Sequence, residues 1–422
     1  MTPPPTAVAT AALAGPWNLD GLVERLAPLR GWKSPEEVGD VVAVLLGRWR
    51  RRPRRPAERL VGEVEALLAS RPGVRPLRPD EPGPGEFRWP VAPWTGLNEL
   101  AAGLDLDGGE LAWFADAGGW LRKVPDGPLQ HYRRRWTASP AGSPRLLESP
   151  APRLAELQRR VARKVLAHVP VHPAAHGFVH GRSPWTLAAL HTARPMVLRL
   201  DLEGFFAHVT GARVAGLLRS AGYPDAVARA LAGLLVTAAP QAVLRAAPGT
   251  GDARRRLLSR LAGPHLPQGA PSSPAVANLL AHRLDRRLAG LAAAVGATYG
   301  RYADDLVFSG DLPVAGLTAR VAEIATDEGF RLRDEKTRVM PAHRRQRVTG
   351  VVVNATPAAA RRDYDELRAL LHNCARTGPE AQNRAGHPAF REHLHGRIAW
   401  VSTGRPARAA KLRELFAAID WD

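Results

Sequence analysis

The segment 297–309, which reads Ala-Thr-Tyr-Gly-Arg-Tyr-Ala-Asp-Asp-Leu-Val-Phe-Ser, decides the fold of this chain. It places two adjacent carboxylates, Asp304 and Asp305, between short runs of apolar, aromatic and β-branched residues. That pattern predicts a β-hairpin whose tight turn presents both acids at one edge of a sheet. Side-by-side carboxylates repel each other, so a divalent cation above the turn would explain them. Because Asp-Asp is also ordinary in turns, the four residues 302–305 alone favour a plain turn over a metal site.

The composition favours a polyanionic partner and excludes several classes of protein. The 422 residues, enough for two or three domains, hold 59 Lys and Arg against 40 Asp and Glu, a formal net charge of +19. The single cysteine, Cys374, excludes both a disulfide framework and a cysteine-based zinc site within the chain. We find no apolar run of membrane-spanning length and no basic start typical of a signal peptide. We therefore expect a cytoplasmic protein without a membrane partner.

Turn signals and periodicity divide the chain into regions. Residues 1–15 are expected to be disordered, and residues 18–70 to form two or three short helices. The basic run 48–55 is either a solvated linker or a patch that binds a nucleic-acid backbone. The Pro- and Gly-rich stretch 71–93 predicts a domain boundary. From residue 94 onward, helices mixed with short hairpin strands predict an α+β unit with a helical end.

A third carboxylate, Asp201, ends the apolar strand predicted over Met196–Leu202. From a neighbouring strand it could project over the hairpin and complete a three-carboxylate cradle with Asp304 and Asp305. Carboxylates, waters and substrate phosphates are what Mg²⁺ prefers, so this ligand set suits a two-metal phosphoryl-transfer site. Taken alone, Asp201 is better explained as a helix cap at a strand end.

The segment 266–274, Leu-Pro-Gln-Gly-Ala-Pro-Ser-Ser-Pro, precedes a predicted amphipathic helix. Gly269 would let the backbone approach a bound base or sugar closely, and Gln268 offers an amide for nucleotide contact. By itself the segment is a proline-rich helix start. Between Asp201 and the Tyr-Ala-Asp-Asp turn it becomes a specific signal.

In this order the motifs resemble those of reverse transcriptases, and specifically of bacterial retron-type enzymes, over about residues 94–422. The three palm motifs of that family are matched by Asp201 with Phe205-Phe206, by Gln268-Gly269 with Ser273-Pro274, and by Tyr302–Asp305. Further matches lie at Arg145–Pro150, Gly177–Ser183, Gly329–Thr337, the Val-Thr-Gly stretch Val348–Asn354, and the tail His395–Trp421.

The resemblance implies a right-hand polymerase of the α+β class, with fingers, a palm built on a small antiparallel sheet, a helical thumb, and a helical N-terminal extension. The expected boundaries are 1–93 for a basic, partly disordered extension, 94–195 for the fingers, 196–355 for the palm with a fingers insertion at 216–264, and 356–422 for the thumb.

The resemblance also implies the roles of the acids. Asp201, Asp304 and Asp305 would be catalytic and would bind two Mg²⁺ ions, with Asp305 in a supporting role. The backbone carbonyl of Leu202 would be a further metal ligand.

Five residues are expected to contact the incoming dNTP: Arg145, Phe206, Gln268, Gly269 and Lys336. Phe206 would exclude ribonucleotides because an aromatic ring there clashes with a 2′-hydroxyl. For Arg145 and Lys336 the alternative is a surface charge, and for Phe206 a core aromatic.

Contact with RNA is expected at His191, Val348, Thr349 and Gly350. His191 could equally be a packing histidine. Leu187 stands where retron enzymes usually carry an asparagine, so RNA recognition here is expected to differ in detail.

The implied function is RNA-directed DNA synthesis on a cognate structured non-coding RNA, giving a short RNA-linked DNA and an RNA–DNA hybrid. In the family such complexes commonly act in antiphage defence with a separate effector protein. The alternatives are another bacterial reverse transcriptase, either group II intron-like or a standalone defence polymerase, and a non-catalytic protein that binds structured RNA.

Overall fold

The computed structural model describes most of the chain as two compact units. The described residues are 3–32, 35–48, 53, 60–62, 64–65, 86–123, 127, 129–137 and 144–421. One unit comprises 1–170 and 204–280, and the other 171–203 and 281–422. These divisions do not coincide with the predicted subdomain boundaries, so the assignment of fingers, palm and thumb stays a prediction.

The first unit is mostly helical and contains the antiparallel hairpin β1–β2. Its strands are β1 (Tyr132–Thr137) and β2 (Arg145–Pro150). Its helices are α1 (Pro5–Leu13), α2 (Leu19–Leu26), α3 (Pro35–Arg48), α5 (Leu97–Gly103), α6 (Gly108–Phe114), η1 (Leu121–Lys123), α7 (Pro152–Lys164), η2 (Leu166–His168), α9 (Gly211–Ser220), α10 (Asp225–Leu235), α11 (Gln241–Arg245), α12 (Gly251–Leu261) and α13 (Ser273–Leu280).

The prediction of disorder over residues 1–15 is wrong for 5–13, which form α1. Proline at the first helical position and the alanine-rich sequence favour a helix, and Val8 and Ala12 are fully buried. Short helices predicted within 18–70 are confirmed by α2 and α3. Most of the basic run 48–55 and most of the predicted boundary 71–93 lie outside the described residues.

The second unit is built on a four-stranded antiparallel sheet of order β4-β5-β3-β6. Its strands are β3 (Met196–Asp201), β4 (Thr298–Tyr302), β5 (Asp305–Gly310), β6 (Arg338–Pro341), and a separate pair β7 (Arg347–Val348) and β8 (Val351–Val352). Its helices are α8 (Pro184–Leu190), α14 (His282–Ala294), α15 (Val314–Asp327), η3 (Asp334–Lys336), α16 (Arg361–Thr377), α17 (Pro379–Gln382), α18 (Phe390–Ser402) and α19 (Pro406–Ala417).

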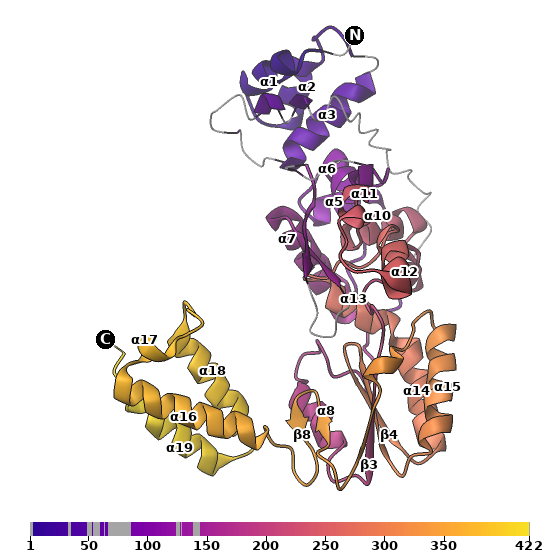
Figure 1. Ribbon diagram of the computed structural model, residues 1–422. Coiled ribbons are helices and arrows are strands. Elements are labelled where there is room, and N and C mark those ends of the chain that lie inside the picture. The colour runs from indigo at the N-terminus through magenta and orange to yellow at the C-terminus, as the bar shows by residue number, and fades with distance from the viewer. Residues whose placement is uncertain are drawn as a thin grey trace. The chain divides into compact units, whose positions relative to one another are not determined.

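Helices cover both faces of this sheet, α14 with α15 on one side and α8 on the other (Figure 1). Leu284 and Leu288, four residues apart, are fully buried on the sheet side of α14. On the α8 side, Leu187 packs with Val197 and Val307. Alternate strand residues therefore face different helices, as the period of two requires. The predicted strand at 196–202 and the predicted hairpin are both confirmed.

The C-terminal helices α16, α18 and α19 share a core of their own, in which Leu367, Leu371, Leu394 and Leu412 are fully buried. The predicted helical end of the chain is confirmed, and so is the α+β class with small antiparallel sheets. Within the described ranges, no helix combines the length and the apolar character that crossing a bilayer requires.

Candidate active site at the β4–β5 turn

The turn that carries the paired acids is as tight as the sequence predicts. Tyr302 ends β4 and pairs directly with Asp305, which begins β5, so Ala303 and Asp304 form a two-residue connection. Ala303 has a φ of 54°, in the left-handed region that hairpin turns of this length use. The turn thus places both acids at one end of the β4–β5 hairpin.

Strand β3 brings the third acid beside the turn. Asp201 is the direct antiparallel partner of Asp305, so both side chains project from the same face. The Leu202 amide donates to the Asp304 carbonyl oxygen at 2.9 Å, which ties the end of β3 to the turn. The predicted meeting of Asp201 with the Asp304–Asp305 turn is confirmed.

Burial is the largest influence on the electrostatics of Asp305. Burial raises the pKa of Asp305 to about 6, and the carboxylates of Asp304 and Asp201 act in the same direction. The Arg199 guanidinium opposes this rise, with its Nε 3.0 Å from Asp305 Oδ1. Sequence reasoning missed Arg199, although a charge inside an otherwise apolar strand was a visible signal.

Asp201 lies between two basic side chains. It is 4 % exposed, and its Oδ2 accepts a hydrogen bond from Lys336 Nζ at 2.9 Å. Arg333 Nε lies 3.6 Å from Oδ1, an oxygen that is buried without a hydrogen-bond partner. Lys336 in η3 therefore lies at the acids; its expected contact with a nucleotide stays a prediction.

The three carboxylates fit a hard divalent cation by their chemistry. In the described part of the chain, no group of three or more His, Cys, Asp or Glu residues is arranged to hold a metal ion as the side chains stand. Asp201 nevertheless keeps one buried oxygen without a hydrogen bond, and the pKa of Asp305 is raised by burial and, to a smaller extent, by its neighbouring acids. A cation would relieve both features.

The other residues expected to contact the dNTP belong to the first unit. The Glu148 amide donates to the Gln268 carbonyl oxygen at 2.8 Å. Gly269 has a φ of 130°, and a Cβ there would lie 3.1 Å from the Glu148 carbonyl oxygen. This close approach explains the glycine and places the Gln-Gly loop on β2, the strand that begins with the exposed Arg145. Phe206 is half-buried and packs edge-on against Phe205 at 5.6 Å.

A buried polar network that sequence reasoning missed supports this loop. Glu148 accepts from Arg134 Nε at 3.1 Å, and His265 Nε2 lies 2.7 Å from its other oxygen. Burial alone would raise the pKa of Glu148, but His265 and Arg134 outweigh it and lower the pKa. His265 stands three residues before Gln268 in sequence, so the network fixes both ends of the contact between the loop and β2.

Two of the four residues expected to bind RNA are buried and require a correction. His191 and Val348 are both 0 % exposed. His191 Nδ1 lies 2.7 Å from Ser309 Oγ, and Val348 packs in the core beside α8. A side chain without exposed surface cannot touch RNA, so His191 is a packing histidine. For Thr349 and Gly350, which have φ of 46° and 92°, RNA contact stays a prediction.

Leu187 also has a packing role that explains its identity. It is fully buried, and a Cβ at Gly300 would overlap its side chain. Leucine on α8 therefore fills the space above the glycine of β4. An asparagine there would need a polar partner in an apolar core.

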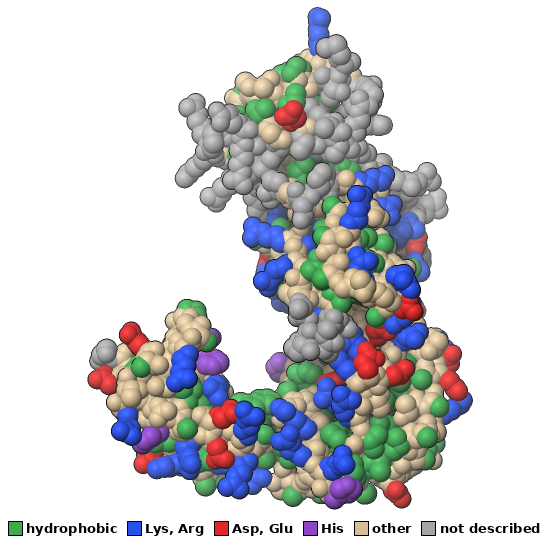
Figure 2. Space-filling view, viewed as in Figure 1, with side chains coloured by type: hydrophobic (Ala, Val, Ile, Leu, Met, Phe, Trp, Pro, Cys, Tyr) green, Lys and Arg blue, Asp and Glu red, His purple; other side chains and the backbone are tan. Residues whose placement is uncertain are grey.

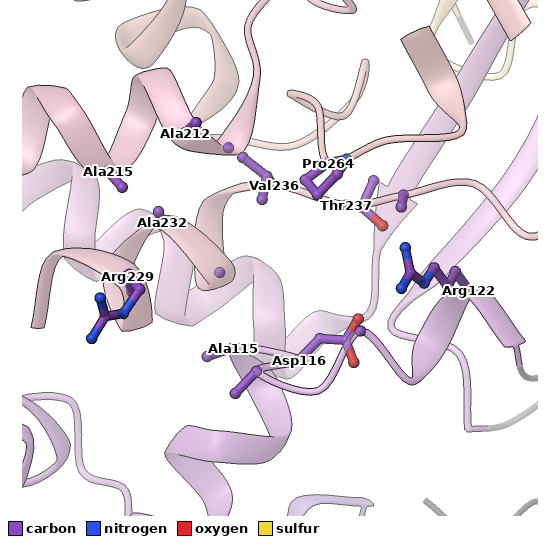
Figure 3. A pocket seen from close by; sticks show the side chains of 15 residues that line it. Ala115, Asp116, Arg122, Ala212, Ala215, Arg229, Ala232, Val236, Thr237 and Pro264 are labelled. Carbon is purple, nitrogen blue, oxygen red and sulfur yellow. The ribbon is translucent and has the colours of Figure 1, made fainter. Parts of the chain in front are cut away.

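A cavity of about 690 Å³ lies apart from the acids, within the first unit (Figure 3). Small residues line most of it, with Asp116, Arg122 and Arg229 among them. Burial raises the pKa of Asp116 to about 6, but its carboxylate accepts hydrogen bonds from the amides of Trp120 and Leu121. The Asp116 carboxylate thus stabilises the local turn through these hydrogen bonds, and we assign no reaction to this cavity.

Comparison with known proteins agrees with the motif pattern. Residues 137–353 match the family model described as reverse transcriptase (RNA-dependent DNA polymerase). The chain is 41 % identical over 328 residues to the Retron Mx65 reverse transcriptase of Myxococcus xanthus, covering 77 % of this chain and 72 % of that protein. It is 40 % identical over 339 residues to the Retron Mx162 reverse transcriptase of the same organism, covering 75 % of this chain and 66 % of that protein.

A more distant relative is the Retron Ec86 reverse transcriptase of Escherichia coli, 30 % identical over 260 residues that cover 61 % of this chain and 71 % of that protein. Among solved structures, a Candida albicans telomerase in complex with a fragment of telomeric RNA aligns with a TM-score of 0.34 and 10 % identity, over 67 % of this chain and 54 % of that chain.

Proposed function

We propose that this chain, which belongs to the reverse transcriptases and is a bacterial retron-type member of that family, copies a cognate structured non-coding RNA into a short RNA-linked DNA by two-metal nucleotidyl transfer. Family membership makes it an RNA-directed DNA polymerase. The RNA, the metal mechanism and the biological role are the proposed part.

One observation carries the mechanism: Asp201 pairs directly with Asp305, beside the turn that bears Asp304. We assign Asp201 and Asp304 as ligands of both cations, with Asp305 and the Leu202 carbonyl in support. When bound, divalent cations, Mg²⁺ by our assignment, supply positive charge that lowers the pKa of the primer hydroxyl and stabilises the phosphates. The chain's own part is to hold these acids close together against their mutual repulsion.

Lys336 is proposed to exchange partners during the reaction. Its ammonium pairs with Asp201 Oδ2 at 2.9 Å, which balances the negative charge of the acids. Asp201 would be needed to hold a cation, and Lys336 would then pair with the triphosphate of the dNTP in place of Asp201. There it would neutralise the developing charge on pyrophosphate and could donate a proton.

Selection of the nucleotide is proposed to lie with residues of the first unit. Gln268 and Gly269 would contact the dNTP from a loop that is held against β2, and Arg145 on that strand would neutralise the triphosphate. Phe206 would exclude a 2′-hydroxyl by steric clash. In the right-hand architecture that we propose, these residues belong to the fingers and palm, and α16 to α19 form the thumb.

The structured RNA and the RNA–DNA hybrid are proposed to bind through exposed basic side chains. Within 331–347 the exposed arginines are Arg331, Arg338, Arg344, Arg345 and Arg347. Lysine and arginine side chains are also spread over the visible face of the second unit (Figure 2). Such charge suits backbone contacts with an A-form duplex. Antiphage defence with a separate effector is the biological role that we propose.

Two rival functions are weaker. A group II intron-like or standalone reverse transcriptase is disfavoured by the 41 % identity to a retron enzyme. A non-catalytic RNA binder is disfavoured because the three acids, Gln268 and Phe206 are all present.

The test compares Asp304→Asn with the matched control Asp327→Asn, an exposed acid at the end of α15. Each protein is purified with the nucleic acid that accompanies it, and incorporation of a labelled dNTP is measured together with RNA affinity. We expect Asp304→Asn to abolish incorporation and leave RNA binding intact, with Asp327→Asn unchanged in both. DNA synthesis by Asp304→Asn at the wild-type rate would refute the assignment. Sequencing the accompanying nucleic acid tests the retron product, because a short DNA joined to a structured RNA is expected.

A further inference from the structure

A buried ion pair lies directly beneath the acidic turn. Arg301 on β4 and Asp285 on α14 are both 0 % exposed. The guanidinium makes a two-pronged contact with the carboxylate, Nε to Oδ1 at 2.8 Å and Nη2 to Oδ2 at 2.7 Å. The Tyr299 hydroxyl donates to the same Oδ1 at 2.8 Å. The carboxylate is thus fully engaged by hydrogen bonds.

Stability alone is a poor explanation for this pair. Moving both charges out of water is expensive, and apolar residues of similar volume are often as stabilising as a buried ion pair. Arg301 is also a fully buried residue of β4, a position where valine or isoleucine would satisfy the sheet equally well. The contact made by the remaining guanidinium nitrogen indicates a role other than stability.

This remaining nitrogen binds the turn itself. Arg301 Nη1 donates to the Ala303 carbonyl oxygen at 3.0 Å. Ala303 has a φ of 54°, a conformation that costs energy for a residue with a side chain, and its carbonyl belongs to the peptide that leads into Asp304. Fixing this carbonyl fixes the plane of the peptide before the proposed metal ligand.

The segment 174–177 holds the other side of the turn. The Arg301 amide donates to the Ala174 carbonyl and the His176 amide donates to the Arg301 carbonyl, both at 2.7 Å. Gly177 then lies so close that a Cβ would be 2.6 Å from the Ala303 nitrogen. Ala303 is therefore held at its carbonyl by Arg301 Nη1, and Gly177 packs closely against its amide nitrogen.

We propose that Asp285 and Arg301 are positioning residues that set the orientation of the Asp304 carboxylate, acting through the Ala303 carbonyl and without touching substrate. The proposal rests on the catalytic role assigned to Asp304. Asp285 fixes the guanidinium, the guanidinium fixes the Ala303–Asp304 peptide, and the peptide aims the carboxylate. Loss of the pair should lower the rate of chemistry more than the affinity for RNA or dNTP.

The experiment uses the full chain with its accompanying RNA and three variants. Asp285→Leu with Arg301→Met removes both charges together and avoids leaving one buried charge unpaired. Arg301→Lys keeps the charge but has a single nitrogen, which cannot hold both carboxylate oxygens and the Ala303 carbonyl. Arg287→Met, on the same helix but paired with Asp327 and Glu328 at the surface, is the matched arginine control.

The readouts are kcat and KM for the dNTP, the thermal midpoint, and amide hydrogen exchange of the peptide that contains the turn. For both the double variant and Arg301→Lys we expect kcat to fall by about 10- to 100-fold, the loss typical of a misplacement near 1 Å, with KM within about twofold. Exchange at the turn should rise while the thermal midpoint of the double variant stays near that of the wild type. Arg287→Met should match the wild type in every readout.

Two results would overturn the proposal. One is a wild-type kcat in the folded double variant, and the other is a fall in kcat no larger than the fall in the folded fraction. If the double variant does not fold, Arg301→Lys alone tests the proposal, by the same criterion of a lower kcat with KM within about twofold. The outcome is separable from the proposed function, because an inactive Asp304→Asn beside a fully active double variant overturns only the positioning role.

Discussion

Gly177→Ala should slow catalysis because the added methyl group collides with the catalytic turn. The new Cβ would lie 2.6 Å from the Ala303 nitrogen and 3.2 Å from the Tyr302 carbonyl carbon, whereas ordinary contact begins at 3.4 Å. The obstructing atoms are backbone, so the turn itself must move by about 0.8 Å to relieve the overlap, at a cost of about 1–3 kcal/mol for overpacking. A displacement of that size at a metal ligand corresponds to about a 100-fold loss of rate.

The assay for Gly177→Ala is single-nucleotide incorporation under saturating dNTP, with thermal unfolding of the same samples. The matched control is Gly316→Ala in α15, an exposed helical glycine around which no atom lies within 4 Å of the added Cβ. That control should keep its activity and gain about 0.5–1 kcal/mol of stability from helix propensity. An active Gly177→Ala with an unchanged thermal midpoint would show that the 174–177 segment does not constrain the turn, and the reasoning would be refuted.

Three further predictions concern other side chains near the acids and in the core. Lys336→Met should lower kcat by about 10-fold, as for loss of a general acid or a charge at the leaving group, and a wild-type kcat would contradict the proposed partner exchange with Asp201. Phe206→Ala should raise incorporation of ribonucleotides relative to dNTPs, measured as the ratio of their kcat/KM values. An unchanged ratio would show that Phe206 has a packing role and does not exclude ribonucleotides. Burial, with smaller contributions from His176 and Arg194, lowers the pKa of His191 from 6.5 to about 3. Between these two pKa values His191 binds a proton in the unfolded chain but not in the folded one. The free energy of unfolding is therefore highest above pH 6.5 and falls as the pH drops toward 3, by about 2 kcal/mol at pH 5. Urea unfolding at pH 7.5 and pH 5 should show this loss in the wild type and not in His191→Gln; equal losses in both would contradict it.

Local sequence pattern was sufficient for the elements that carry the acids. The apolar strand at Met196–Asp201 and the tight turn at Ala303-Asp304 each depend on neighbouring residues alone, and the structure confirms both. The order of the motifs was enough to indicate the family, which the comparisons confirm. The expectation of disorder over residues 1–15 is wrong for 5–13, where the helix propensity of an alanine-rich segment favours a helix.

The sequence did not predict which side chains several of the buried polar and charged groups contact. A pattern of apolar residues predicts which face of an element is buried, but it does not say which charge lies opposite. Lys336 meets Asp201 across 135 residues, and His191 meets Ser309 across 118. The expected RNA contacts at His191 and Val348 are wrong because both residues are buried. Their burial depends on how α8, the sheet and the β7–β8 pair pack together, which the local sequence does not show.

The sequence by itself determined that this chain carries a polymerase motif set, with Asp304 and Asp305 in a tight turn and Asp201 at a strand end. These features follow from short-range sterics and turn chemistry, which act between residues a few positions apart. Only the tertiary structure decided that Asp305 faces Asp201, that Lys336 balances Asp201, and that a buried Asp285–Arg301 pair supports the peptide before Asp304. The physical reason is that strand register and helix packing choose the partner of a buried charge, and that choice is made by the whole fold.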